Sequence, residues 1–169
     1  MRIHLALSAA LLILAAAPAA AQAVKIGYVN TIRIESESAP AKRAAVAIEQ
    51  AFAPRQQEIA ALRKRIAALQ DKLAKEGGTM PPAEQQAGQR SLAEMMKQSD
   101  QMSRAFAEDL ELRKNQERAR VTEEANIAIK AVADAGHYDL ILQQAAYSSP
   151  GIDITDQVLK GMAKGAGSQ

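Results

Sequence analysis

The chain has 169 residues, a formal net charge of +2 and no cysteine. This length suits one domain, and an aromatic content of 3% without tryptophan argues against a large conventional core. The basic residues are not concentrated in one patch, which argues against nucleic-acid binding, and a chain without cysteine needs no disulfide in an oxidising compartment.

Residues 1–23 have the features of a secretory signal peptide. A short basic start, residues 1–4, precedes an apolar run over residues 5–17, which is too short to span a bilayer core of about 30 Å. Small residues then form a cleavage site, and we expect cleavage between Ala23 and Val24. The alternative is an anchor that stays uncleaved.

The mature chain is predicted to begin with a strand and a short helix. Residues 24–30 alternate apolar and other side chains, which is typical of a strand, and residues 31–38 are polar and are expected to form a turn. Ser38 is a candidate N-cap for a helix whose first turn contains Pro40. Pro54 would remove a hydrogen bond inside that helix, so we expect a kink or a boundary near Ala53.

A helical hairpin is predicted to follow. Apolar residues recur at alternating spacings of three and four, the pattern of a coiled-coil seam, at Ile59, Leu62, Ile66, Leu69 and Leu73. Gly77 and Gly78 are expected to end this helix through left-handed backbone conformations, and Pro81 and Pro82 fit the first turn of the next one. Helices of roughly 20 and 50 residues would reach about 30 and 75 Å.

The second helix is expected to pack on the first and then to enter a larger core. Its inner face carries Met95, Met96, Met102 and Phe106, and a second apolar stripe starts at Val121. Gly136 is expected to stop the helix. Residues 138–143 then read as a strand, residues 145–147 as its continuation or another strand, and residues 148–151 as a turn. A closing helix over residues 156–162 would be capped by Thr155 or Asp153.

These elements predict an α+β fold with two parts. A small β body is formed by residues 24–53 and 120–169, and residues 54–119 form a long antiparallel α-helical hairpin, the arm. Three or four short strands make a marginal sheet with open edges, so we expect protomers to associate through their strands.

Several segments resemble the OmpH family of periplasmic chaperones. They are residues 24–30, residues 105–110, and residues 138–142 followed by 146–150 and 153–159. The resemblance implies a homotrimer whose barrel-like β body carries three helical arms around a cavity. It also implies ATP-independent holding of unfolded outer-membrane proteins in the periplasm, without a cofactor. The segment between Leu142 and Tyr147 is shorter than in the family pattern, which predicts an altered hairpin and strand register.

The sequence contains no constellation of nucleophile, base or metal ligands, so the protein is not expected to be an enzyme, and binding is expected to be diffuse. Methionines adapt to varied partners, but the favoured interpretation of Met95, Met96 and Met102 is that they fill the seam. The candidates for the seam or for client contact are Ile59, Leu62, Ile66, Leu69, Leu73, Met80, Met95, Met96, Met102 and Phe106.

A basic flank is the second candidate surface, made of Arg63, Lys64, Arg65, Arg90 and Lys97. It could attract acidic substrates or the head groups of acidic lipids, and the family resemblance adds lipopolysaccharide as a partner. The alternative is an ordinary solvated coiled-coil flank. For the whole protein, the alternative function is that of a structural or adaptor coiled coil of the cell envelope.

Overall fold

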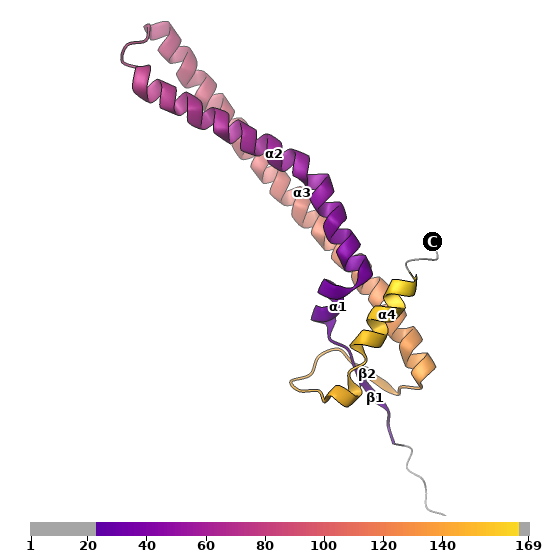
Figure 1. Cartoon of the computed structure of the whole chain (residues 1–169). Coiled ribbons are helices and arrows are strands. Elements are labelled where there is room, and N and C mark those ends of the chain that lie inside the picture. Colours follow the sequence, from indigo (N-terminus) through magenta and orange to yellow (C-terminus); the bar gives the residue numbers. More distant parts are fainter. Residues whose placement is uncertain (1–22, 166–169) are drawn as a thin grey trace, which may run out of the picture.

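The computed structural model describes residues 23–165, so the predicted signal peptide, apart from Ala23, lies outside the described residues. Two long helices form an antiparallel hairpin that projects from a small body, which contains the remaining elements (Figure 1). In chain order the elements are β1 (Ile26–Tyr28), α1 (Thr31–Glu37), α2 (Ala39–Glu76), α3 (Pro82–Gly136), β2 (Leu140–Leu142), η1 (Pro150–Ile152) and α4 (Thr155–Gly165). The predicted combination of a helical arm with a small β body is confirmed.

The sheet of the described chain has two parallel strands. Ile26 pairs with Leu140 and Tyr28 with Leu142, so the connection between β1 and β2 is the whole helical arm. An isolated parallel bridge joins Tyr28 to Asp153 on the chain that leads into α4. The strand expected over residues 145–147 is absent, because β1 already has β2 and this bridge beside it and offers no further partner within the protomer.

The buried core lies in the body, where α3 and α4 pack beside the β1 strand and α1. Val29 and Val158 are completely buried, and Ile154 and Ile34 are almost so. Gly27 in the middle of β1 has no room for a side chain, since an added Cβ would lie 2.8 Å from Ile141 Cδ1. The other members of this core are Val121, Ala125, Ala128, Ile129 and Met162.

Residues 31–37 form a helix, so the turn predicted for this segment was wrong. The Asn30 side chain accepts a hydrogen bond from the Arg33 backbone N–H at 3.1 Å and caps α1. Arg33 also pairs with Glu37 one turn later at 2.9 Å, and Ile34 of the same helix is buried in the core of the body. The polar composition therefore reflects an exposed helix face rather than a turn.

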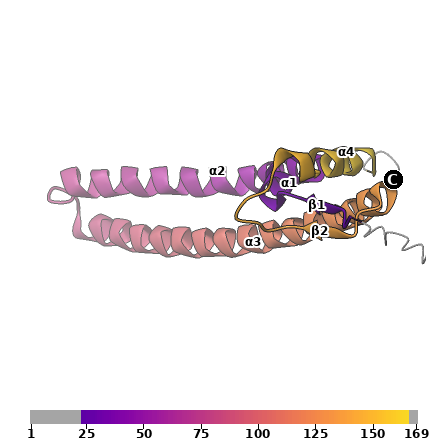
Figure 2. The same ribbon diagram turned by 90° about the horizontal axis from the view of Figure 1, so that it is seen from below.

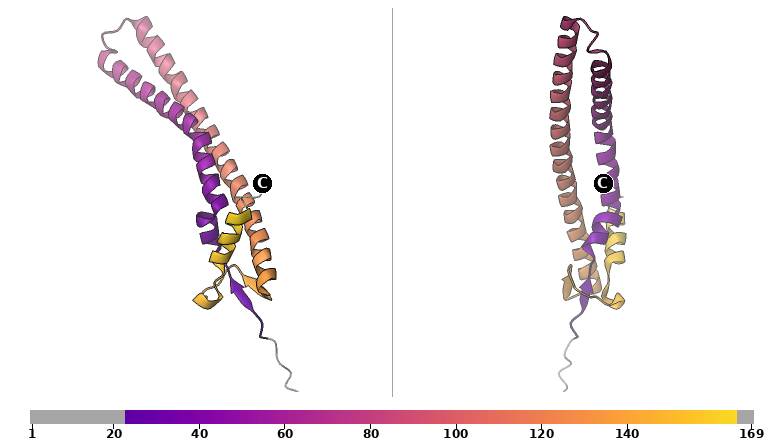
Figure 3. Two further views of the ribbon diagram at one scale, coloured as in Figure 1. Left: turned by 45° about the vertical axis from the view of Figure 1, so that its right-hand side comes forward. Right: turned by 90° about the vertical axis from the view of Figure 1, so that its left-hand side faces the viewer.

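Helix α2 runs without interruption through Pro54, so no boundary occurs there and the helix is longer than expected, with 38 residues. The Ser38 side chain caps it by accepting from the Ala41 N–H at 3.3 Å, as predicted. Pro54 is exposed and lies away from the seam, where water can bond to the carbonyl that proline leaves unpaired. The ribbon of α2 changes direction between base and tip (Figure 3).

The hairpin reverses between Glu76 and Pro82, as predicted, but not through left-handed glycines. No described glycine has a positive φ, and Gly77 itself has φ −55° and ψ −33°. Glycine is needed at this point for space, because a Cβ on Gly77 would collide with the carbonyl oxygen of Leu73. The two helices then lie side by side along the arm (Figure 2).

Helix α3 ends at Gly136, as predicted, but the residue in the left-handed conformation is His137, with φ 52° and ψ 49°. The N–H of Tyr138 donates to Ala133 O at 3.0 Å and that of His137 to Asp134 O at 3.3 Å, which is a Schellman motif. Gly136 instead makes room for the Tyr138 ring, into which a Cβ would project. Lys25 Nζ donates to Gly136 O at 2.6 Å, and the negative end of the α3 dipole favours a cation at this position.

Helix α4 is tied to β1 through its first residue. The completely buried Thr155 accepts a hydrogen bond at its hydroxyl from the Asn30 N–H at 2.9 Å, and Asp153 accepts from the Thr155 N–H at 2.8 Å. Of the two predicted caps, Asp153 therefore bonds a free N–H of α4, whereas Thr155 links the helix to Asn30, the N-cap of α1.

Candidate binding surface on the helical arm

The seam of the arm is formed by the predicted apolar residues of α2 and α3. Ile59 and Leu62 are buried, and the Phe52 and Phe106 rings meet edge to face at 5.7 Å between their centroids. Half-buried positions continue the seam towards the tip at Ile66, Leu69, Leu73, Met95 and Met102. Several seam side chains thus remain partly accessible, because two helices alone cannot enclose them.

Small residues let the helices approach each other at two further points of the seam. A Cβ on Gly88 would lie 2.8 Å from Leu73 Cδ2, so the missing side chain admits the leucine. Ser99 is buried where a larger apolar residue would otherwise be expected. Met80 is half-buried at the tip, beyond the end of α2.

Met96 differs from Met95 and Met102 because it lies outside the seam. Its exposed fraction is 45%, whereas Met95 and Met102 are half-buried between the helices. Met96 is therefore accessible to solvent, and Met95 and Met102 contribute to the packing of the two helices.

A hollow of about 460 Å³ opens on one side of the seam near the middle of the arm. Ile59 and Phe106 supply apolar surface to it, and Arg63 donates a hydrogen bond to Ser103 Oγ at 3.0 Å across its border. Gln56 and Ala60 complete its lining. The arm thus offers an apolar depression bordered by hydrogen-bonding groups, with no catalytic constellation around it.

The predicted basic residues do not form one patch. Arg63 lies on the side of α2 that faces Ser103, and the next two positions, Lys64 and Arg65, follow around the helix at 100° steps. Arg90 and Lys97 lie on α3. In the described chain, the side chains of Lys64, Arg65, Arg90 and Lys97 are exposed and make no ion pair.

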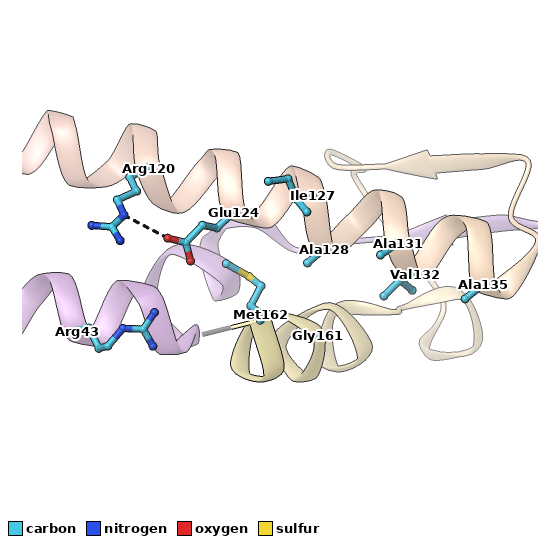
Figure 4. A pocket seen from close by; sticks show the side chains of 11 residues that line it. Arg43, Arg120, Glu124, Ile127, Ala128, Ala131, Val132, Ala135, Gly161 and Met162 are labelled. Carbon is cyan, nitrogen blue, oxygen red and sulfur yellow. Dashed lines mark ion pairs between the residues drawn. The ribbon is translucent and has the colours of Figure 1, made fainter. Parts of the chain in front are cut away.

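A larger hollow, of about 540 Å³, lies in the body between α3 and α4 (Figure 4). It is lined mainly by small and apolar side chains, including Ala128, Val132 and Met162. Arg43 of α2 borders one end, beside Arg120, whose Nε lies 3.3 Å from a carboxylate oxygen of Glu124. Sequence reasoning missed this hollow, and the signal that could have indicated it is the series of alanines at helical spacing in α3.

The charged side chains of the body hold its elements together. Hydrogen bonds from Arg33 lower the pKa of the exposed Glu37 carboxyl, and those that Arg33 makes to Glu37 and Asp156 raise the pKa of the guanidinium. The hydroxyl and the backbone N–H of Thr155 hold the pKa of the Asp153 carboxyl below its ordinary value. These shifts accompany structural contacts rather than a reactive centre.

Among residues 23–165 no helix combines the length and the apolar character needed to cross a membrane. The same part of the chain contains no cluster of three or more histidine, cysteine, aspartate or glutamate side chains able to hold a metal ion.

Comparison with known proteins gives a consistent result over most of the chain. Residues 25–162 match the family described as "Outer membrane protein (OmpH-like)". The "Chaperone protein Skp" of Yersinia enterocolitica is 29% identical over 147 residues, covering 86% of this chain and 90% of that protein. The protein of the same name from Photorhabdus laumondii subsp. laumondii is 30% identical over 139 residues, covering 80% and 84%.

A solved structure from Caulobacter crescentus, described as a putative outer membrane chaperone (OmpH-like), has the same fold. Its TM-score with this chain is 0.72, at 16% sequence identity, and the match covers 84% of this chain and 85% of that one.

Proposed function

The chain belongs to the OmpH-like family of outer membrane proteins, and on this premise we propose that it is an ATP-independent periplasmic holdase chaperone. It would bind unfolded outer-membrane proteins and prevent their aggregation on the way to the outer membrane. The observation that carries this proposal is a long two-helix arm with an incompletely covered seam, in a chain that matches chaperones over most of its length.

The arm suits weak binding of many different unfolded chains. Its accessible apolar surface is distributed along the seam rather than gathered in one pocket that would select one ligand. Exposed methionine adds a side chain that adapts to partners of different shape. Release would then need no nucleotide, because many weak contacts exchange individually.

The proposal includes a homotrimer. The described sheet has only two short strands, and large apolar side chains of the body remain exposed, among them Leu140 at 46% and Val24 at 66%. Association through this region would cover them and would place three arms around a common cavity. Signal-peptide cleavage after Ala23 and location in the periplasm belong to the same proposal.

Binding of lipopolysaccharide or other acidic lipid by the arm also stays a prediction. The five basic candidates lie around two helices, and all five are exposed and make no ion pair in the described chain, so any lipid contact would be distributed. Binding of vesicles with and without anionic lipid would test it.

Dilution of a urea-unfolded outer-membrane protein into buffer, followed by light scattering, tests the chaperone proposal. We expect a several-fold excess of this protein to suppress the scattering, and an equal excess of a folded protein of similar charge to have no effect. Unchanged aggregation would contradict the proposal. Stoichiometric capture of one folded envelope protein, without affinity for unfolded chains, would instead support the adaptor function.

A further inference from the structure

The two flanks of the arm differ in charge, and we propose that the less charged flank is the surface on which an extended segment of an unfolded polypeptide lies. This inference rests on the proposed function, since it specifies which part of each arm contacts the client. The two surfaces are called the neutral flank and the charged flank below.

Two contacts between the helices identify the flanks. With Ile59 and Leu62 as positions a and d of a heptad, Arg63 is at position e and Lys72 at position g. The hydrogen bond from Arg63 to Ser103 marks the flank where e positions meet, which is the neutral flank. The ion pair between Lys72 and Glu84, at 3.7 Å, marks the flank where g positions meet, which is the charged flank.

Between residues 56 and 110 of the arm, the e and b positions that form the neutral flank include only two charged residues, Arg63 and Asp100. On α2 its e and b positions are Gln56, Ala60, Arg63, Ala67, Gln70 and Ala74, all of them exposed. On α3 the same positions between residues 86 and 110 include one charged residue, Asp100, together with the exposed Met96. The g and c positions of α2, by contrast, include Glu58, Arg65, Lys72 and Lys75.

The hollow of about 460 Å³ independently confirms which residues share the neutral flank. Gln56, Ala60 and Arg63 line it together with Ser103, as the heptad assignment requires. Ile59 and Phe106 give it apolar surface, so it has room for an apolar side chain of a partner. The amide of Gln56 lies where it could bond the backbone of that partner.

The charge of the neutral flank decides which partner fits. Lipid phosphates and nucleic acids need several cations, and this flank supplies only Arg63, which already bonds Ser103. An unfolded strand of a membrane protein instead presents apolar and uncharged polar side chains in alternation. Alanine at the b positions 60, 67 and 74 also allows its backbone to come close to the α2 helix.

The repeat distances predict weak binding without a fixed register. Side chains on one side of an extended strand recur about every 7 Å. Equivalent positions of the arm recur every seven residues, which is about 10.5 Å along a helix. The two repeats coincide only occasionally, so a client can move along the flank while exchanging equivalent contacts.

Neighbouring alanines of α2 allow a matched test. Ala60→Asp with Ala67→Asp places two carboxylates on the neutral flank, and Ala61→Asp with Ala68→Asp places them on the charged flank. All four alanines are exposed, so both variants have the same net charge and similar helix propensity. We expect the first variant to need at least three-fold more protein for half suppression of aggregation, and the second to remain within about 1.5-fold of the unmodified protein.

A binding measurement tests the neutral-flank assignment separately from the proposed chaperone function. Because the chain has no cysteine, Ala60→Cys and Ala61→Cys can each carry one environment-sensitive dye, and only the dye at residue 60 should report the unfolded client. Equal losses in both aspartate variants, or equal signals from both dyes, would overturn the neutral-flank assignment. Failure of the unmodified protein to suppress aggregation would instead overturn the proposed function.

Discussion

Replacement of His137 by glycine should stabilise the protein. His137 is the one described residue other than glycine with a positive φ, and a left-handed conformation costs a side chain about 1–2 kcal/mol. Glycine removes this cost but loses more backbone entropy on folding, about 0.5–1 kcal/mol. The expected net gain in the free energy of unfolding is therefore about 0.5–1 kcal/mol, because the exposed imidazole makes no side-chain hydrogen bond within the described chain.

Thermal unfolding followed by circular dichroism can measure this gain. A domain of this size gains about 2–4 °C in Tm per kcal/mol, so His137→Gly should raise Tm by roughly 1–4 °C. The protomer concentration must be equal for all variants, since association raises apparent stability.

Two controls test the reasoning behind this prediction. Ala135→Gly introduces the same residue two positions earlier, where the backbone is helical, and should lower the free energy of unfolding by about 1 kcal/mol. Gly136→Ala should also destabilise, because its Cβ would project into the Tyr138 ring. A fall in Tm for His137→Gly would refute the assignment of backbone strain to this position.

Three further perturbations address the arm and the body. Leu62→Asp should accelerate amide exchange along the arm, because losing the buried leucine costs about 3 kcal/mol of local stability. The mass of the oligomer should stay unchanged. Dissociation into monomers would contradict the division into arm and body. Pro54→Ala should slow amide exchange around residue 54 by about ten-fold, since it restores a helical hydrogen bond. Unchanged exchange would show that Pro54 does not limit the local stability of α2. Asp153→Asn should lower Tm at pH 7 but much less at pH 2. The lowered pKa of Asp153 stabilises the folded state above about pH 4, and this contribution disappears as the pH falls through the pKa of the folded state. An equal loss of Tm at both pH values would argue against a stabilising role of the Asp153 carboxylate.

Local patterns in the chain were sufficient to predict the arm. The spacing of Ile59, Leu62 and Ile66 and the break before Pro82 depend on contacts between residues three and four apart or on backbone chemistry at one position. The first strand, the Ser38 cap and the closing helix were predictable for the same reason.

Positions whose conformation depends on distant partners were not predictable in this way. The α1 helix forms around the buried Ile34, and the segment over residues 145–147 stays irregular because β1 is already paired on both sides. The same applies to the end of α3, where the sequence indicates that Gly136 stops the helix but not that its missing side chain makes room for the Tyr138 ring. His137 takes the left-handed conformation.

For the candidate binding surface, the sequence by itself determined which residues are apolar and that they repeat with the period of a helical hairpin. Only the tertiary structure decided that Met96 lies outside the seam, that the basic residues do not form one patch, and that one flank is nearly uncharged. The physical reason is that a heptad pattern defines faces on each helix separately. Which faces become neighbours depends on how the second helix returns along the first.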